Sequence, residues 1–202
     1  MEAQGWEAFR NPEYAGHVYM YDSERDAFMV ALKALGYSAN SDDPAQLEEA
    51  YNWLRDMDKA VQPSYVTDEV IDSMANGEKW MALVYSGDAA YILSENEDMG
   101  YCTPEAGTNG AVDAMVIPAN ASNPELANQF IRYILEYENS LMISEEVGYA
   151  SSNAQVLEEL SGEGGDYEGN DAYLPRGGYE KDEFYHDIPE DLRSQYSSMW
   201  IK

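Results

Sequence analysis

Short apolar runs alternate with helical patterns between residues 17 and 117, and this alternation is the strongest constraint on the fold. Apolar runs of strand length occur at 17–21, 61–65, 79–85, 99–103 and 114–117. Between them, apolar residues recur at helical spacing after Ser23, after Asp43, after Thr67 and over 87–95. Because strands that alternate with helices form a sheet covered by those helices, the sequence predicts an α/β fold.

Capping signals set the expected start of three of these helices. Ser23 and Thr67 are residue types that accept a hydrogen bond from the first helical turn. Asp43 precedes Pro44, which favours the first helical position, and Gln46 is placed to complete a capping box.

The pattern changes after residue 118. Helices are predicted from Asn123 and from Asn139, with a further one or two turns over 153–160. Residues 161–183 hold six glycines among acids and tyrosines, which predicts a partly disordered loop. A final helix is predicted after Pro189.

The charge of the chain excludes two classes of partner. Eleven Lys and Arg against 39 Asp and Glu give a formal net charge of −28. Such a charge repels nucleic acid phosphates and anionic lipid headgroups, although most of these acids are expected on a solvated surface. No apolar run is long enough to cross a membrane, and the N-terminal residues lack the features of a signal peptide. We therefore expect neither nucleic acid binding nor membrane insertion of this segment.

No constellation of catalytic residues is present in the sequence. It contains no G-x-S-x-G, P-loop, G-x-G-x-x-G or H-E-x-x-H pattern. His17 and His186 lie far apart, and Cys102 is the single cysteine. The prediction is a protein that is not an enzyme and has no cofactor or metal.

Aromatic and acidic residues follow the predicted strands. Tyr85 and Asp88 follow one strand, Ser23 and Asp26 follow another, and Asp113 precedes a third. Carboxylates bind ammonium groups while aromatic faces cover a methylene chain, so the mixture suits a flexible organic cation. The alternative is ordinary structure, with the acids and Ser23 at helix starts or turns and Tyr85 in the core.

Several segments resemble, in order and spacing, the spermidine/putrescine-binding proteins of bacterial ABC transporters. They are 20–28, 31–38, 83–89, 104–109, 113–118 and 148–153. The resemblance implies a type II periplasmic-binding-protein fold, in which two α/β lobes close over a polyamine at the periplasmic or extracellular face of the bacterial membrane.

The resemblance also implies that the chain corresponds to the C-terminal part of such a protein. Residues 1–16 would be a connecting segment and 17–112 the second ligand-binding lobe. Residues 113–202 would return toward a first lobe and include the acidic Gly-rich loop 161–183.

Three residues match family positions around the middle of the ligand. Tyr85 matches an aromatic placed against the polyamine stem, and Asp88 matches an acid of putrescine-preferring relatives. Asp113 matches the central carboxylate of the pocket. Ala111 departs from the family, which usually has Trp at this position.

Three further residues match the far end of the pocket. Asp26 matches an acid that binds the far amine, and Ser23 stands where the spermidine protein has a second Asp. Tyr185 is the nearest match to a polar pocket residue close to the C-terminus. The implied ligand is a polyamine, a diamine being favoured, and the implied partner is a transporter permease. The alternative is a truncated lobe that binds no ligand and acts as an interaction or dimerisation domain.

Overall fold

The structure is a computed structural model that describes residues 2–174 and 176–200. Contacts divide the chain into two compact units, which we describe separately. The first unit comprises Met1–Val84, Cys102–Ala111 and Arg176–Lys202, and the second comprises Tyr85–Tyr101 and Val112–Pro175. The lobe boundaries expected from the resemblance, 17–112 and 113–202, stay a prediction.

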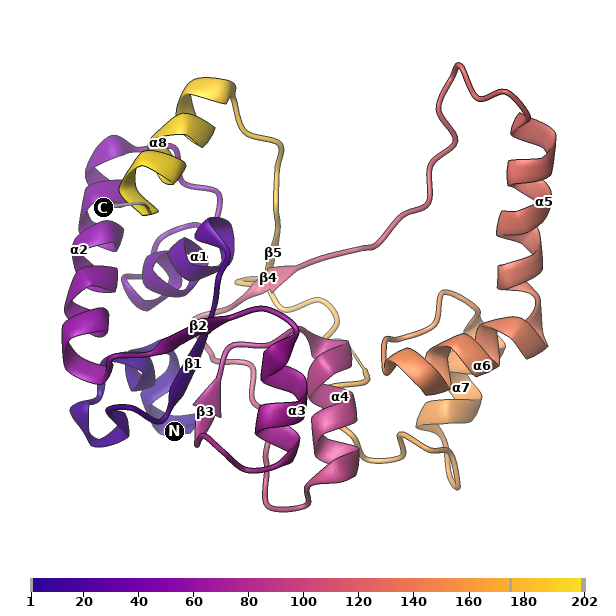
Figure 1. Cartoon of the computed structure of the whole chain (residues 1–202), viewed down its shortest axis with the longest axis horizontal. Coiled ribbons are helices and arrows are strands. Elements are labelled where there is room, and N and C mark those ends of the chain that lie inside the picture. The colour runs from indigo at the N-terminus through magenta and orange to yellow at the C-terminus, as the bar shows by residue number, and fades with distance from the viewer. Residues whose placement is uncertain (1, 175, 201–202) are drawn as a thin grey trace. The chain divides into compact units, whose positions relative to one another are not determined.

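The first unit contains two 3₁₀ helices, five strands and four α-helices among its described residues. The 3₁₀ helices are Glu2–Arg10 and Pro12–Tyr14. The strands are β1 (Val18–Tyr21), β2 (Ser64–Val66), β3 (Met81–Ala82), β4 (Asn109–Gly110) and β5 (Glu183–Phe184). The helices are α1 (Glu24–Ala34), α2 (Pro44–Val61), α3 (Glu69–Ala75) and α8 (Glu190–Trp200) (Figure 1).

A parallel sheet with the order β2-β1-β3 organises this unit. All four residues of the central strand β1 are buried, as expected for a parallel strand covered on both faces. The helix α1 packs on α2 and on the first 3₁₀ helix, and α8 packs on α1. The core contains Val18, Met20, Phe28, Leu32, Leu47, Trp53, Met57 and Tyr196. This arrangement confirms the predicted α/β class.

Two predicted caps are present and two are not. The Ser23 and Asp43 side chains accept hydrogen bonds from the backbone N–H groups of Asp26 and Ala45. Thr67 does not cap α3, because that helix starts after Asp68, and the Thr67 hydroxyl donates to Glu69 instead. Gln46 completes no capping box, because its side chain accepts from the Ser41 hydroxyl.

Most of the predicted strands are shorter than expected or absent. The run 61–65 is divided, since Val61 ends α2 and β2 begins at Ser64. The run 79–85 pairs only at Met81–Ala82, and 99–103 is not a strand. The run 114–117 is also not a strand, because no neighbouring strand in the described part of the chain pairs with it. Isolated strand-forming residues do not hold a strand without such pairing.

The second unit is built from α4 (Ser86–Glu95), α5 (Pro124–Leu135), α6 (Tyr137–Val147) and α7 (Ala154–Ser161). The predicted helix from Asn123 and the helix over 153–160 are confirmed, whereas α6 begins before Asn139, at Tyr137. The helix α6 packs on α4, α5 and α7. Among the described residues no helix combines the length and the apolar composition needed to cross a membrane.

The Gly-rich segment after α7 is packed in its first half rather than disordered. Tyr167, Ala172 and Tyr173 are buried, and the two tyrosine rings stack with centroids 4.4 Å apart. The Tyr173 hydroxyl lies 3.0 Å from the Ser144 hydroxyl of α6. These aromatic contacts hold the first half of a segment whose composition alone predicted a partly disordered loop.

Helix α5 carries an apolar face that the second unit does not cover. None of its residues is buried, although its apolar residues recur at helical spacing. Leu126, Phe130 and Tyr133 are each more than half exposed. Val112, Met115 and Val116 of the preceding segment are exposed as well.

Candidate functional site

The six predicted ligand-binding residues fall into two groups, one in each unit. Ser23, Asp26 and Tyr185 lie in the first unit. Tyr85, Asp88 and Asp113 lie in the second unit.

The first group is centred on a buried carboxylate. Asp26 lies in the first turn of α1 and is 6% exposed. Its Oδ1 accepts hydrogen bonds from the Tyr185 hydroxyl at 3.0 Å and from Asn109 Nδ2 at 3.3 Å. The Ser23 hydroxyl accepts from the Asp26 backbone N–H at 3.4 Å, so Ser23 acts as the helix cap. Two residues that are far from Asp26 in sequence, Asn109 and Tyr185, therefore meet at this acid, and Ser23 caps its helix.

The pairing of β4 with β5 brings Asn109 and Tyr185 to Asp26. Asn109 is opposite Glu183 and Gly110 is opposite Phe184 in this parallel pair. A Cβ atom added at Gly110 would lie 3.0 Å from the Phe184 ring, so the absence of a side chain permits this close approach.

The ring of Tyr185 is held by a neighbouring arginine. The Arg25 guanidinium lies 4.5 Å from the Tyr185 ring centroid and 5.6 Å from that of Tyr196. Arg25 Nη2 lies 3.5 Å from Asn40 Oδ1, whereas its buried Nε has no hydrogen-bond partner among the described residues. Burial raises the pKa of the Tyr196 hydroxyl, and the nearby Arg25 charge opposes that rise.

The second group surrounds the start of α4. Tyr85 occupies the N-cap position and is 37% exposed, and Asp88 lies in the first helical turn. The Tyr149 hydroxyl donates a hydrogen bond to Asp88 Oδ1 at 3.3 Å. Buried Gly87 allows the Tyr149 ring to lie directly against the helix, because an added Cβ would overlap ring atoms. A carboxylate and two tyrosines are thus gathered at one helix start.

Asp113 is exposed, in a stretch without regular secondary structure. The structure brings together Asp26 with Tyr185 in one unit, and it places Asp88 near Tyr149 in the other. The roles predicted for Tyr85, Asp88, Asp113, Asp26, Ser23 and Tyr185 as ligand-binding residues stay predictions.

Sequence reasoning assigned no role to Asn109 or Tyr149, which contact the two acids. Both residues lie within segments that carry the family resemblance, 104–109 and 148–153. Their contacts cross 83 and 61 residues of sequence, so spacing along the chain gave no indication of them.

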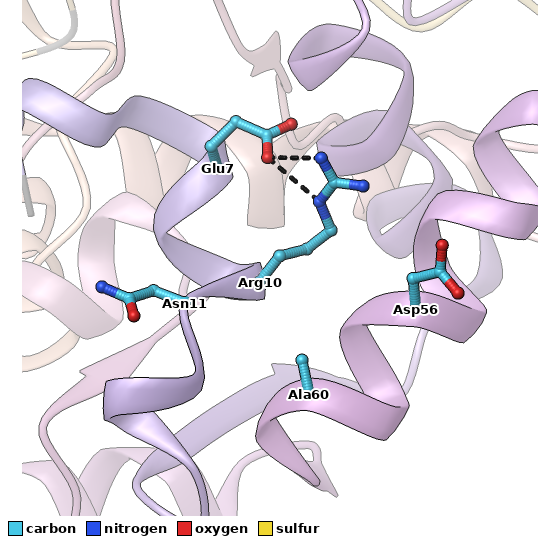
Figure 2. Close-up of a pocket in the computed structure, with 5 residues that line it drawn as sticks. All are labelled: Glu7, Arg10, Asn11, Asp56 and Ala60. Atoms are coloured by element: carbon cyan, nitrogen blue, oxygen red, sulfur yellow. Dashed lines mark hydrogen bonds and ion pairs between the residues drawn. The ribbon is translucent and has the colours of Figure 1, made fainter.

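A separate hollow of about 350 Å³ lies beside the first 3₁₀ helix (Figure 2). Its charged groups are already paired, since Arg10 donates to Glu7 Oε2 from Nε at 3.0 Å and from Nη2 at 2.6 Å. The Trp53 indole donates to the other oxygen of Glu7 at 2.9 Å. We therefore assign this hollow no ligand. The described residues also contain no cluster of three metal-ligating side chains.

The class of protein to which this α/β fold and its two acid–tyrosine groups belong follows from the family match. Residues 2–169 match the family of bacterial extracellular solute-binding proteins, and the chain belongs to that family.

Within this family, the chain is similar to several proteins named for polyamine binding or transport. The chain is 30% identical over 158 residues to the spermidine/putrescine-binding periplasmic protein of Escherichia coli K12, a match that covers 78% of this chain and 45% of that protein. A solved chain attributed to a spermidine/putrescine ABC transporter of Listeria monocytogenes is 32% identical, with a TM-score of 0.87. The match covers 98% of this chain and 60% of that one.

A third relative is the spermidine/putrescine ABC transporter substrate-binding protein of Streptococcus pneumoniae. Its structure is 30% identical with a TM-score of 0.80, and the match covers 98% of this chain and 60% of that one. The chain spans about half the length of the curated relatives it matches. By name, the first of these relatives is a periplasmic binding protein and the third is the substrate-binding protein of an ABC transporter.

Proposed function

We propose that this chain contributes to polyamine capture by the solute-binding component of an ABC transporter, outside the bacterial membrane. The observation that carries the proposal is the match to polyamine-binding relatives over 78% of the chain. The structure supports it through Asp26 and Asp88, two carboxylates that each accept a hydrogen bond from a tyrosine.

The proposed chemistry is recognition of ammonium groups by these carboxylates. Asp26 in the first unit and Asp88 in the second would each bind an ammonium group through a charge-assisted hydrogen bond, and the ring of Tyr85 would cover a methylene chain beside Asp88. Asp113 would contribute a further charge. Ser23 adds no charge beside Asp26, and with Asp88 this favours a diamine such as putrescine over spermidine. Capture and delivery to a permease need no covalent step, so we propose that the protein is not an enzyme.

Calorimetry with putrescine and spermidine tests this function on the chain and on a version extended to the full length of its relatives. We expect the extended protein to bind at least tenfold more tightly, because closure of two lobes removes the ligand from water. In the extended protein, Asp26→Asn and Asp88→Asn should each weaken putrescine binding by about tenfold, as expected for loss of a charge-assisted hydrogen bond.

Glu125→Gln is the matched control for charge, because Glu125 is an exposed acid on α5 outside both groups. Its affinity should equal that of the unmutated protein. An extended protein that binds neither polyamine would refute the assignment, and tight binding by the chain alone would refute the two-lobe account.

We also propose that the apolar face of α5 binds another protein surface. In a solution of this chain alone, that surface belongs to a second copy of the chain, and the two copies form a dimer. Leu126 and Phe130 are 59% and 58% exposed, and such a face is unfavourable in water. Light scattering should report a dimer that Phe130→Glu converts to monomer, whereas Glu125→Gln should leave it unchanged. A monomer at all concentrations would rule this contact out.

A further inference from the structure

A second hollow in the first unit lies between α2, β2 and α8, and we call it the α2–α8 groove. Its volume is about 550 Å³, within the usual range of roughly 300 to 1,000 Å³ for small-molecule sites. It is lined by Asp22, Phe28, Tyr51, Leu54, Arg55, Asp58, Lys59, Tyr65, Met199 and Trp200. None of the six residues of the proposed polyamine site lines this groove.

The groove has an apolar floor and aromatic walls. Phe28 and Leu54 belong to the core and are 1% and 6% exposed. Together with Met199, which packs against the core, they form the apolar floor of the groove. Tyr65 and Trp200 meet edge to face with ring centroids 5.5 Å apart. This surface suits the apolar body of a small ligand.

Four charged residues line the groove, and the two bases are engaged by neighbours. The Arg55 guanidinium lies 5.7 Å from the Tyr51 ring centroid. The Lys59 ammonium lies 3.4 Å from the Asp56 carboxylate, outside the groove lining. The two acids, Asp22 and Asp58, are both exposed, and Asp58 accepts a long hydrogen bond from Tyr65 at 3.4 Å.

The Tyr65 hydroxyl lies near both acids of the groove. Burial, then the charge of Asp58 and its hydrogen bond, then the charge of Asp22, raise the pKa of Tyr65 to about 12. Burial disfavours a charge of either sign at this hydroxyl, whereas the part of the rise that comes from Asp58 and Asp22 reflects their negative charge. These two carboxylates favour a positively charged group.

We propose that the α2–α8 groove binds a small organic ammonium ion with an apolar body. The ammonium group lies beside Asp22 and Asp58, and the apolar body packs against the Tyr65–Trp200 ring pair above the core floor. The Asp58 and Asp22 carboxylates next to Tyr65 favour this occupant over an anion, and the apolar floor favours it over an inorganic cation. The site is independent of the proposed polyamine function.

A titration followed by NMR tests the groove, with the chain as it is and phenethylammonium as the probe. Phenethyl alcohol and phenylacetate are matched probes that keep the ring and change only the charge. The Trp200 indole N–H signal, assigned by its loss in Trp200→Phe, should move at roughly millimolar phenethylammonium. Binding of the alcohol should be at least threefold weaker, and binding of phenylacetate weaker still.

Two variants locate the ammonium group. Asp58→Asn and Asp22→Asn should each weaken phenethylammonium binding about threefold to tenfold, whereas Glu48→Gln, an exposed acid of α2 outside the groove, should not. The inference is overturned if the Trp200 signal does not move, if the alcohol or phenylacetate binds as tightly as the amine, or if neither Asp variant weakens binding. Polyamine affinity of the extended protein is measured separately, so the two proposals fail independently.

Discussion

Glu183→Ala is expected to lower the free energy of unfolding by about 3 kcal/mol, because it leaves a buried ammonium group without its counter-ion. Lys33 is 4% exposed, and its Nζ lies 3.0 Å from Glu183 Oε2 and 2.8 Å from the Lys181 carbonyl oxygen. The same Glu183 oxygen accepts from the Ala39 backbone N–H at 2.5 Å. Urea unfolding followed by tryptophan fluorescence measures the loss.

The control is an exposed ion pair of the same kind. Asp187 lies 3.4 Å from Arg193 with its side chain 96% exposed, so Asp187→Ala should change stability by less than about 0.5 kcal/mol. The double variant Lys33→Met with Glu183→Gln should be more stable than Glu183→Ala, because it removes the buried charge itself. A loss below about 1 kcal/mol for Glu183→Ala would contradict a buried, compensated ion pair.

The same ion pair makes stability depend on pH in a defined direction. Burial alone would raise the pKa of Glu183, but the Lys33 ammonium and the Ala39 and Ser38 donors outweigh it and hold that pKa below the usual 4.5. A lowered folded-state pKa adds stability above pH 4.5, and this stability is lost as pH falls through the folded-state value. The stability difference between the unmutated chain and Glu183→Gln should therefore shrink on acidification below that pH.

Gly87→Ala is expected to cost about 2 kcal/mol and to separate Tyr149 from Asp88. The added Cβ would overlap the Tyr149 ring, and Gly87 is buried in a helix that cannot easily shift. Thermal unfolding measures the stability, and loss of the Tyr149 hydrogen bond should also lower putrescine affinity of the extended protein.

Gly100→Ala is the control for the general effect of replacing glycine, because the residue is exposed and a Cβ atom added there would meet no described residue beyond its chain neighbours within 4 Å. Its stability should change by less than about 0.5 kcal/mol. In a Tyr149→Ala background, Gly87→Ala should lose most of its effect, since the overlapping ring is gone. Equal effects of Gly87→Ala and Gly100→Ala would exclude the steric explanation.

Much of the helical structure could be predicted because its signals are local. Ser23 and Asp43 cap α1 and α2, and helices follow Asn123 and Pro189, as the sequence predicts. A cap acts within one turn, so neighbouring residues are enough to specify it. The strand predicted over 114–117 failed because a strand is stabilised by its neighbour, which the local sequence does not contain.

Some features of the candidate site could likewise be predicted from the sequence, and others could not. The sequence alone determined the class of fold, the acidic character of the chain and the place of Asp26 and Asp88 in the first turns of two helices. Only the tertiary structure decided that Tyr185, 159 residues from Asp26, donates to that acid. Hydrogen bonds and steric contacts act over a few ångströms of space. Residues that are distant in sequence therefore make such contacts only in the folded chain, where the β4–β5 pairing brings the segments together.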